Sequence, residues 1–89
     1  MEKFMKLKEY KNNYVHYFLD ENDKLQGEYK SYYGNGQGQL YYKCYYKDSK
    51  RQGEYKRYSP DGSLKYKRYY SNGKDVTDMY NKLNVWKSL

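Results

Sequence analysis

Apolar and polar residues alternate along several short stretches of this chain, most clearly in LYYKCYYK at residues 40–47. A period of two, with one side more apolar than the other, is typical of a half-buried antiparallel strand. The more apolar side of this stretch carries Leu40, Tyr42, Cys44 and Tyr46, and the other side carries Tyr41, Lys43, Tyr45 and Lys47. The same reasoning predicts strands near residues 3–11, 14–19, 27–33, 40–47, 53–58 and 64–70.

The sequence of one predicted hairpin occurs in two similar copies. QGEYKSYYGNGQGQLYYKCYYKD at residues 26–48 returns as QGEYKRYSPDGSLKYKRYYSNGK at residues 52–74. Gly27 and Gly53 lie 26 residues apart but Leu40 and Leu64 only 24, so the first copy carries two extra residues, which fall within a turn. Insertions confined to a turn are what a stacked β-hairpin repeat predicts. Pro60, Asp61-Gly62 and Asn72-Gly73 supply turn signals, because proline presets φ and Asn or Asp followed by Gly tolerates positive φ.

The last segment changes period. Its apolar residues fall at helical spacing, with Asp75 as a candidate N-cap and Asp78 in the first turn, where its charge suits the helix dipole. We expect an amphipathic helix at 76–87 that lies on the sheet or covers its last edge. Its apolar residues are Val76, Met79, Tyr80, Leu83 and Trp86.

The predicted fold is therefore mainly β, an antiparallel meander of consecutive β-hairpins with a C-terminal amphipathic capping helix. A chain of 89 residues is expected to form a single domain. Its predicted parts are N-terminal strands with a degenerate repeat at 1–26, repeats at 27–52 and 53–74, and the capping helix at 75–89.

Short words in the two copies resemble the variant MORN repeat of bacterial proteins, many of which are called YwqK-family antitoxins. The matching words are Gly27-Glu28-Tyr29, Tyr32-Tyr33 and Asn35-Gly36, then Gly53-Glu54-Tyr55, Tyr58 and Asp61-Gly62, then Tyr69-Tyr70 and Asn72-Gly73. The resemblance covers roughly residues 17–74. It implies a sheet of hairpins that acts as a protein-interaction module, in some cases as an antitoxin that neutralises a toxin by direct contact. The chain departs from the family in having two clear copies and in ending with a helix.

Composition narrows the classes of partner. Sixteen tyrosines make up much of the apolar content, and each ring can pack while its hydroxyl stays in water. Eighteen Lys and Arg against eleven Asp and Glu give a net charge of +7, which favours anionic partners. Nucleic acid, anionic lipid and acidic proteins all satisfy this condition. The single cysteine favours a reducing compartment, and no apolar stretch reaches the ~18 residues of a membrane span, so we expect a cytoplasmic protein without a membrane partner.

Catalytic chemistry has little support in the sequence, and we expect no enzyme activity, no cofactor and no metal. His16 and Cys44 are the only imidazole and thiol, and they fall on different predicted strands. We expect His16 to pack among aromatic residues and Cys44 to lie in the core. Glu28 and Glu54 occupy the same position in the two copies, which indicates cross-strand pairs with Lys or Arg.

We expect a binding module that acts on a protein target, as an antitoxin-like or phage-type inhibitor of a toxin or defence enzyme. Interleaved Lys and Tyr leave an alternative open, namely RNA or single-stranded DNA on the same face. A third alternative is a homodimer formed through an exposed edge strand at 3–11. The candidate partner-binding residues are Tyr41, Lys43, Tyr45, Lys47, Lys65, Lys67 and Tyr69.

Overall fold

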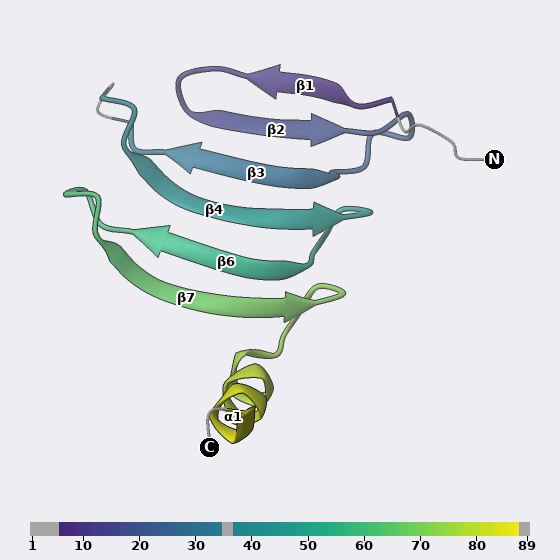
Figure 1. Ribbon diagram of the computed structural model, residues 1–89. Helices are drawn as coiled ribbons and strands as arrows, with labels where there is room; N and C mark the ends of the chain where they lie inside the picture. Colours follow the sequence, from purple (N-terminus) through teal and green to yellow (C-terminus); the bar gives the residue numbers. More distant parts are fainter. Residues whose placement is uncertain (1–5, 35–36, 88–89) are drawn as a thin grey trace.

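The computed structural model describes residues 6–34 and 37–87, with side chains as far as Leu83. In this part of the chain one antiparallel sheet is followed by a single helix (Figure 1). The mainly β meander with a C-terminal helix is thus confirmed. Its elements are β1 (Lys8–Lys11), β2 (Val15–Leu19), β3 (Gly27–Tyr32), β4 (Leu40–Lys47), β5 (Lys50–Arg51), β6 (Gly53–Tyr58), β7 (Leu64–Ser71), β8 (Lys74–Asp75) and α1 (Thr77–Lys87).

The strands follow one another across the sheet in the order β1-β2-β3-β4-β6-β7-β8, while β5 pairs with β4. Figure 1 shows the strands bowed along their length, with α1 beyond β7 at the last edge. The molecule measures 44 × 43 × 19 Å, so it is a thin layer. A sheet of this kind has to stabilise itself largely through side chains on its own two faces.

Most strand limits agree with the sequence pattern to within one residue, and the first strand is the exception. It begins at Lys8, which pairs with Leu19 at the end of β2. After Leu19 the chain leaves β2 and turns at Asp20, so Lys6 and Leu7 have no β2 residue to pair with. Residues 3–5 of the expected strand lie outside the described residues, as do the Asn35-Gly36 turn and the side chain of Trp86.

Two short strands, β5 and β8, were not expected. Neither Lys50–Arg51 nor Lys74–Asp75 carries an alternating apolar pattern, so the sequence gives no strand signal there. They form because tight turns fold the chain back on β4 and β7. Asp48 and Ser49 in one turn, and Asn72 and Gly73 in the other, all have positive φ, the geometry of a type I′ hairpin.

One face of the sheet, which we call the tyrosine face, carries a row of stacked rings that crosses six strands. Successive ring centroids in this row lie between 5.0 and 6.4 Å apart. Among the described residues, the buried apolar side chains are Cys44 (1% exposed) and Tyr55 (3%), both on this face. The core is therefore a layer of tyrosines. The row consists of Tyr10, Tyr17, Tyr29, Tyr42, Tyr55 and Tyr66.

Helix α1 begins at Thr77, one residue later than expected, and Asp75 stabilises its start. The Asp75 carboxylate accepts hydrogen bonds from both the backbone N–H and the hydroxyl of Thr77. These bonds hold the pKa of Asp75 below its ordinary value. The apolar side of the helix packs on the sheet only in part. Tyr80 stacks on Tyr69, while Met79 and Leu83 stay exposed.

Candidate binding surface

The face opposite the tyrosine face carries a row of lysines. Strand register places Lys30 opposite Lys43, Lys43 opposite Lys56, and Lys56 opposite Lys67, on β3, β4, β6 and β7. Paired residues of an antiparallel sheet point to the same side, so the four ammonium groups share one face, which we call the lysine face. His16 continues the row on β2, opposite Lys30.

Like charges directly opposite one another destabilise a sheet, and two glutamates offset this repulsion. Glu28 Oε1 lies 3.1 Å from Lys30 Nζ, and its Oε2 lies 3.9 Å from Lys43 Nζ. The next repeat copies the arrangement, since Glu54 lies 3.1 Å from Lys56 and 3.8 Å from Lys67. The expected cross-strand pairs are therefore present only at the longer distance, because a tyrosine lies directly opposite each glutamate and its nearer lysine belongs to its own strand.

Local interactions keep these lysines charged. The hydrogen bond with Glu28, and then its negative charge, raise the pKa of Lys30 above the ordinary value, and Glu54 does the same for Lys56. A hydrogen bond with Tyr69 raises the pKa of Lys67, whose ammonium lies 5.6 Å from the centre of the Tyr69 ring. Two lysines and one glutamate give each Lys-Glu-Lys cluster a formal net charge of +1.

Two tyrosines flank the lysines, and their surroundings differ. Tyr45 lies opposite Glu28 and is 37% exposed. Tyr69 lies opposite Glu54, and the Tyr80 ring of α1 stacks on it with centroids 3.6 Å apart. The helix thus lies on the lysine-face side of β7. The sequence did not indicate which face of the sheet the helix would cover. Of these two tyrosines, Tyr45 is the more accessible.

Tyr41 and Lys65 do not follow the alternation that the sequence pattern assumed. The register shifts so that Ser31 pairs with Tyr42 and Tyr32 pairs with Leu40, which leaves Tyr41 as the extra residue of a bulge. Lys65 is the equivalent residue in β7. A bulge redirects side chains, so alternation no longer fixes their side.

Tyr41 is drawn toward an arginine of the tyrosine face. Arg57 Nη1 donates a hydrogen bond of 2.8 Å to the Tyr41 hydroxyl, and its guanidinium carbon lies 4.6 Å from the ring centre. The Tyr41 ring also meets the edge of the Tyr33 ring. Grouping Tyr41 with Lys43 and Tyr45 was therefore a misplacement, and the structure gives Tyr41 a packing role beside Arg57.

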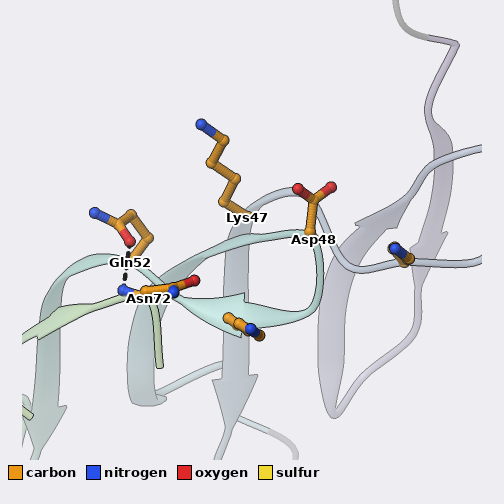
Figure 2. Close-up of a pocket in the computed structure, with 6 residues that line it drawn as sticks. Lys47, Asp48, Gln52 and Asn72 are labelled. Carbon is orange, nitrogen blue, oxygen red and sulfur yellow. Dashed lines mark hydrogen bonds between the residues drawn. The ribbon is translucent and has the colours of Figure 1, made fainter. Parts of the chain in front are cut away.

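Lys47 is the last residue of β4 and extends the lysine face to the strand ends, near the turns at Asp48 and Asn72. Figure 2 shows Lys47 pointing away from the ribbon, above a hydrogen bond from the Asn72 backbone N–H to the Gln52 side chain. A pocket of about 450 Å³ lies here. Its lining holds three cations and one carboxylate, so it favours small anions by charge alone. The lining residues are Lys24, Lys47, Asp48, Lys50, Gln52 and Asn72.

His16 and Cys44 take the structural positions expected of them. The His16 ring packs against Phe18, and its Nε2 lies 2.7 Å from Glu9 Oε2. Cys44 is buried on the opposite face, and burial raises the pKa of its thiol. The two groups are therefore separated by the sheet. Within residues 6–34 and 37–87, no cluster of three His, Cys, Asp or Glu residues is arranged to hold a metal ion.

The sequence-predicted site omitted Lys30 and Lys56, which are two of the four lysines of the row. The signal was present, because both close the repeated word GEYK. These lysines were overlooked because the faces were assigned from the return strands, β4 and β7, alone. The register, which was not known, places β3 beside β4 and places β6 between β4 and β7.

The chain matches no protein-family model, no curated protein and no solved structure. The resemblance to variant MORN repeats therefore stays a prediction. Among the described residues there is also no helix with the length and apolar character needed to cross a membrane.

Proposed function

We propose that this protein is a non-enzymatic binding module whose lysine face docks on an acidic surface of a protein partner. The observation that carries the proposal is the lysine row Lys30, Lys43, Lys56 and Lys67, bridged by Glu28 and Glu54. Rows of charge of this kind steer an oppositely charged partner and set its orientation. Tyr45 beside the row supplies aromatic contact area of the type enriched in interfaces.

The resemblance to variant MORN repeats supports a narrower form of the proposal. In this form the protein is an antitoxin-like or phage-type inhibitor that covers a functional surface of a toxin or defence enzyme. A cytoplasmic location is proposed with it, in keeping with the free thiol of Cys44.

The carboxylates argue for protein over nucleic acid as the partner. A phosphodiester that followed the lysine row would pass beside Glu28 and Glu54, whose oxygens lie within 4 Å of the same ammonium groups. A protein surface with alternating acidic and hydrogen-bonding groups can match both signs. Single-stranded RNA or DNA is the second candidate, favoured by the continuity of the row across four strands.

The first experiment is affinity capture from cell lysate, with and without nuclease, followed by titration of the recovered protein. The double variant Lys43→Gln/Lys56→Gln is expected to bind roughly tenfold more weakly, because two partly exposed ion pairs of about 0.5–1 kcal/mol each are lost. Lys8→Gln/Arg68→Gln removes the same charge from the tyrosine face, where both side chains are exposed, and serves as the control.

Three outcomes discriminate between the proposals. Weaker binding of the partner by Lys43→Gln/Lys56→Gln alone supports the lysine face as the binding surface. Equal weakening by both double variants shows that only net charge matters and contradicts the proposed surface. Recovery of nucleic acid alone, with an affinity that falls steeply between 50 and 200 mM salt, as counterion release predicts, replaces the protein partner by the second candidate.

A further inference from the structure

Strand β1 forms the first edge of the sheet, and its outer side is open to pairing. It pairs with β2 through Lys8 to Lys11, and all four residues are exposed. Figure 1 shows β1 as the outermost strand, with no element of the described chain beyond it. An edge strand with free N–H and C=O groups is a template for another strand.

The last edge of the sheet is occupied differently. Val76 N–H donates to the Tyr69 carbonyl at 2.8 Å, and Tyr69 N–H donates to the Thr77 hydroxyl at 3.0 Å. These bonds use the outward backbone groups of Tyr69, and β8 pairs with the two residues that follow. Helix α1 then lies beyond β7. The C-terminal part of β7 is therefore unavailable for a head-to-tail array of sheets, whereas β1 is open along its length to a second β1 strand.

The hydrogen-bond pattern within the first hairpin shows which β1 groups face outward. Asn12 N–H donates to the Val15 carbonyl, so this pair is hydrogen-bonded. Hydrogen-bonded and non-bonded pairs alternate along an antiparallel ladder, so Tyr10 directs its backbone groups toward Tyr17 of β2. Glu9 and Lys11 consequently direct theirs away from the sheet.

One register of two β1 strands satisfies backbone, charge and ring packing together. If Tyr10 lies opposite Tyr10 of a second copy, Glu9 lies opposite Lys11 of that copy, and these pairs can exchange both of their backbone hydrogen bonds. Opposite charges then face each other across the strands. On the other face Tyr10, which stacks on Tyr17 at 5.0 Å and is 49% exposed, meets its own counterpart and extends the tyrosine row.

We infer that two copies of this chain associate through antiparallel β1 strands, with Tyr10 at the two-fold axis and Glu9 paired with Lys11 of the other copy. The contact is isologous and closes at a dimer, because the other edge carries α1. It extends one continuous sheet across both copies. This inference goes beyond the proposed function and holds whether or not the lysine face binds a protein.

Cysteine cross-linking tests the register on the full chain. Tyr10→Cys is expected to form a disulfide-linked dimer under mild oxidation, because directly opposite residues of a non-bonded pair have close Cβ atoms. Glu9→Cys is the matched control, since it lies opposite Lys11 of the second copy and is not expected to link. The unchanged chain, in which Cys44 is buried, controls for the native thiol.

Charge exchange provides a second test that keeps the tyrosine ring. Glu9→Lys is expected to raise the dimer dissociation constant by roughly tenfold in sedimentation equilibrium, because it sets like charges opposite each other twice. The double variant Glu9→Lys/Lys11→Glu restores opposite charges and is expected to recover the dimer. Circular dichroism checks that each variant retains the sheet.

Three results would overturn the inference. The first is a monomer of 11.0 kDa at every concentration up to about 1 mM. The second is preferential cross-linking of Glu9→Cys, and the third is failure of the charge exchange to restore the dimer. Either of the last two excludes the register with Tyr10 at the axis.

Discussion

Gln26 and Gln52 each reach from the start of a repeat to the turn that ends the same repeat. The Gln26 side-chain amide donates to Asp20 at 2.9 Å and to Asp48 at 2.7 Å, and its oxygen accepts the Asp48 N–H. Gln52 accepts the Asn72 N–H at 2.7 Å. Equivalent residues thus make an equivalent bond, which explains at the residue scale why both repeats begin with Gln-Gly.

Replacing Gln26 tests this link between the start and the end of a repeat. Gln26 is buried, and Gln26→Ala removes the acceptor of the Asp48 N–H and the donor to Asp20 Oδ2, while Asp20 Oδ1 keeps the Asn22 and Lys24 N–H groups. We expect the free energy of unfolding to fall by about 1–3 kcal/mol in urea denaturation. Gln52→Ala is the control, because Gln52 is exposed and its hydrogen bond with Asn72 lies at the surface, so its loss is expected to cost about 0.5–1.5 kcal/mol. A larger loss for Gln52→Ala would contradict this ranking.

At the scale of elements, α1 begins where another strand would have begun. Gln26 N–H donates to the Phe18 carbonyl, Gln52 N–H to that of Tyr45, and Val76 N–H to that of Tyr69. The three positions are equivalent, but the next residue differs. Gly27 and Gly53 adopt φ values of +82° and +86°, which lead into a strand, whereas Thr77 begins the helix. Glycine adopts this geometry without the steric cost that threonine would meet.

The Thr77 hydroxyl joins this helix to the sheet. Thr77 is 7% exposed, and its hydroxyl accepts the Tyr69 N–H and donates to Asp75. Thr77→Val keeps the shape but leaves the Tyr69 N–H unsatisfied, so we expect a loss of about 1–3 kcal/mol and faster hydrogen exchange at the Tyr69 amide. Thr77→Ser retains the hydroxyl and should keep that amide protected. Unchanged protection in Thr77→Val would show that the hydroxyl does not hold the helix.

At the scale of the whole molecule, stability depends on a single row of rings. Tyr55 lies at 3% exposure between Tyr42 and Tyr66, with ring centroids 5.3 and 6.4 Å away. The guanidinium of Arg57 donates a hydrogen bond to the Tyr55 hydroxyl. Because the molecule is only 19 Å thick, removal of one central ring affects the whole core.

Tyr55→Ala is therefore expected to destabilise the protein by about 3–5 kcal/mol, a large part of the 5–15 kcal/mol typical of a folded domain. Thermal or urea unfolding followed by circular dichroism measures the effect. Tyr66→Ala removes the next ring of the same row, which is 36% exposed, and should cost clearly less. Equal losses would mean that burial does not set the contribution of each ring.

Much of the fold was predictable, because its information is local. Alternation marked β2, β3, β4, β6 and β7, and turn residues marked the ends of the hairpins. The candidate surface was predictable only in part. Lys43, Tyr45, Lys47 and Lys67 were assigned to the lysine face, where the register places them, while Tyr41 was misplaced because a bulge breaks alternation.

The sequence by itself determined the long hairpins, the helix and the repetition of the word GEYK, since period, turn chemistry and word spacing are properties of neighbouring residues. Tertiary structure alone decided which strands lie side by side, and so brought Lys30 and Lys56 into one row with Lys43 and Lys67. It also decided that Tyr80 stacks on Tyr69 and that the β1 edge stays open while α1 lies at the other. The physical reason is that register and stacking depend on contacts between residues far apart in the chain, which no local pattern encodes.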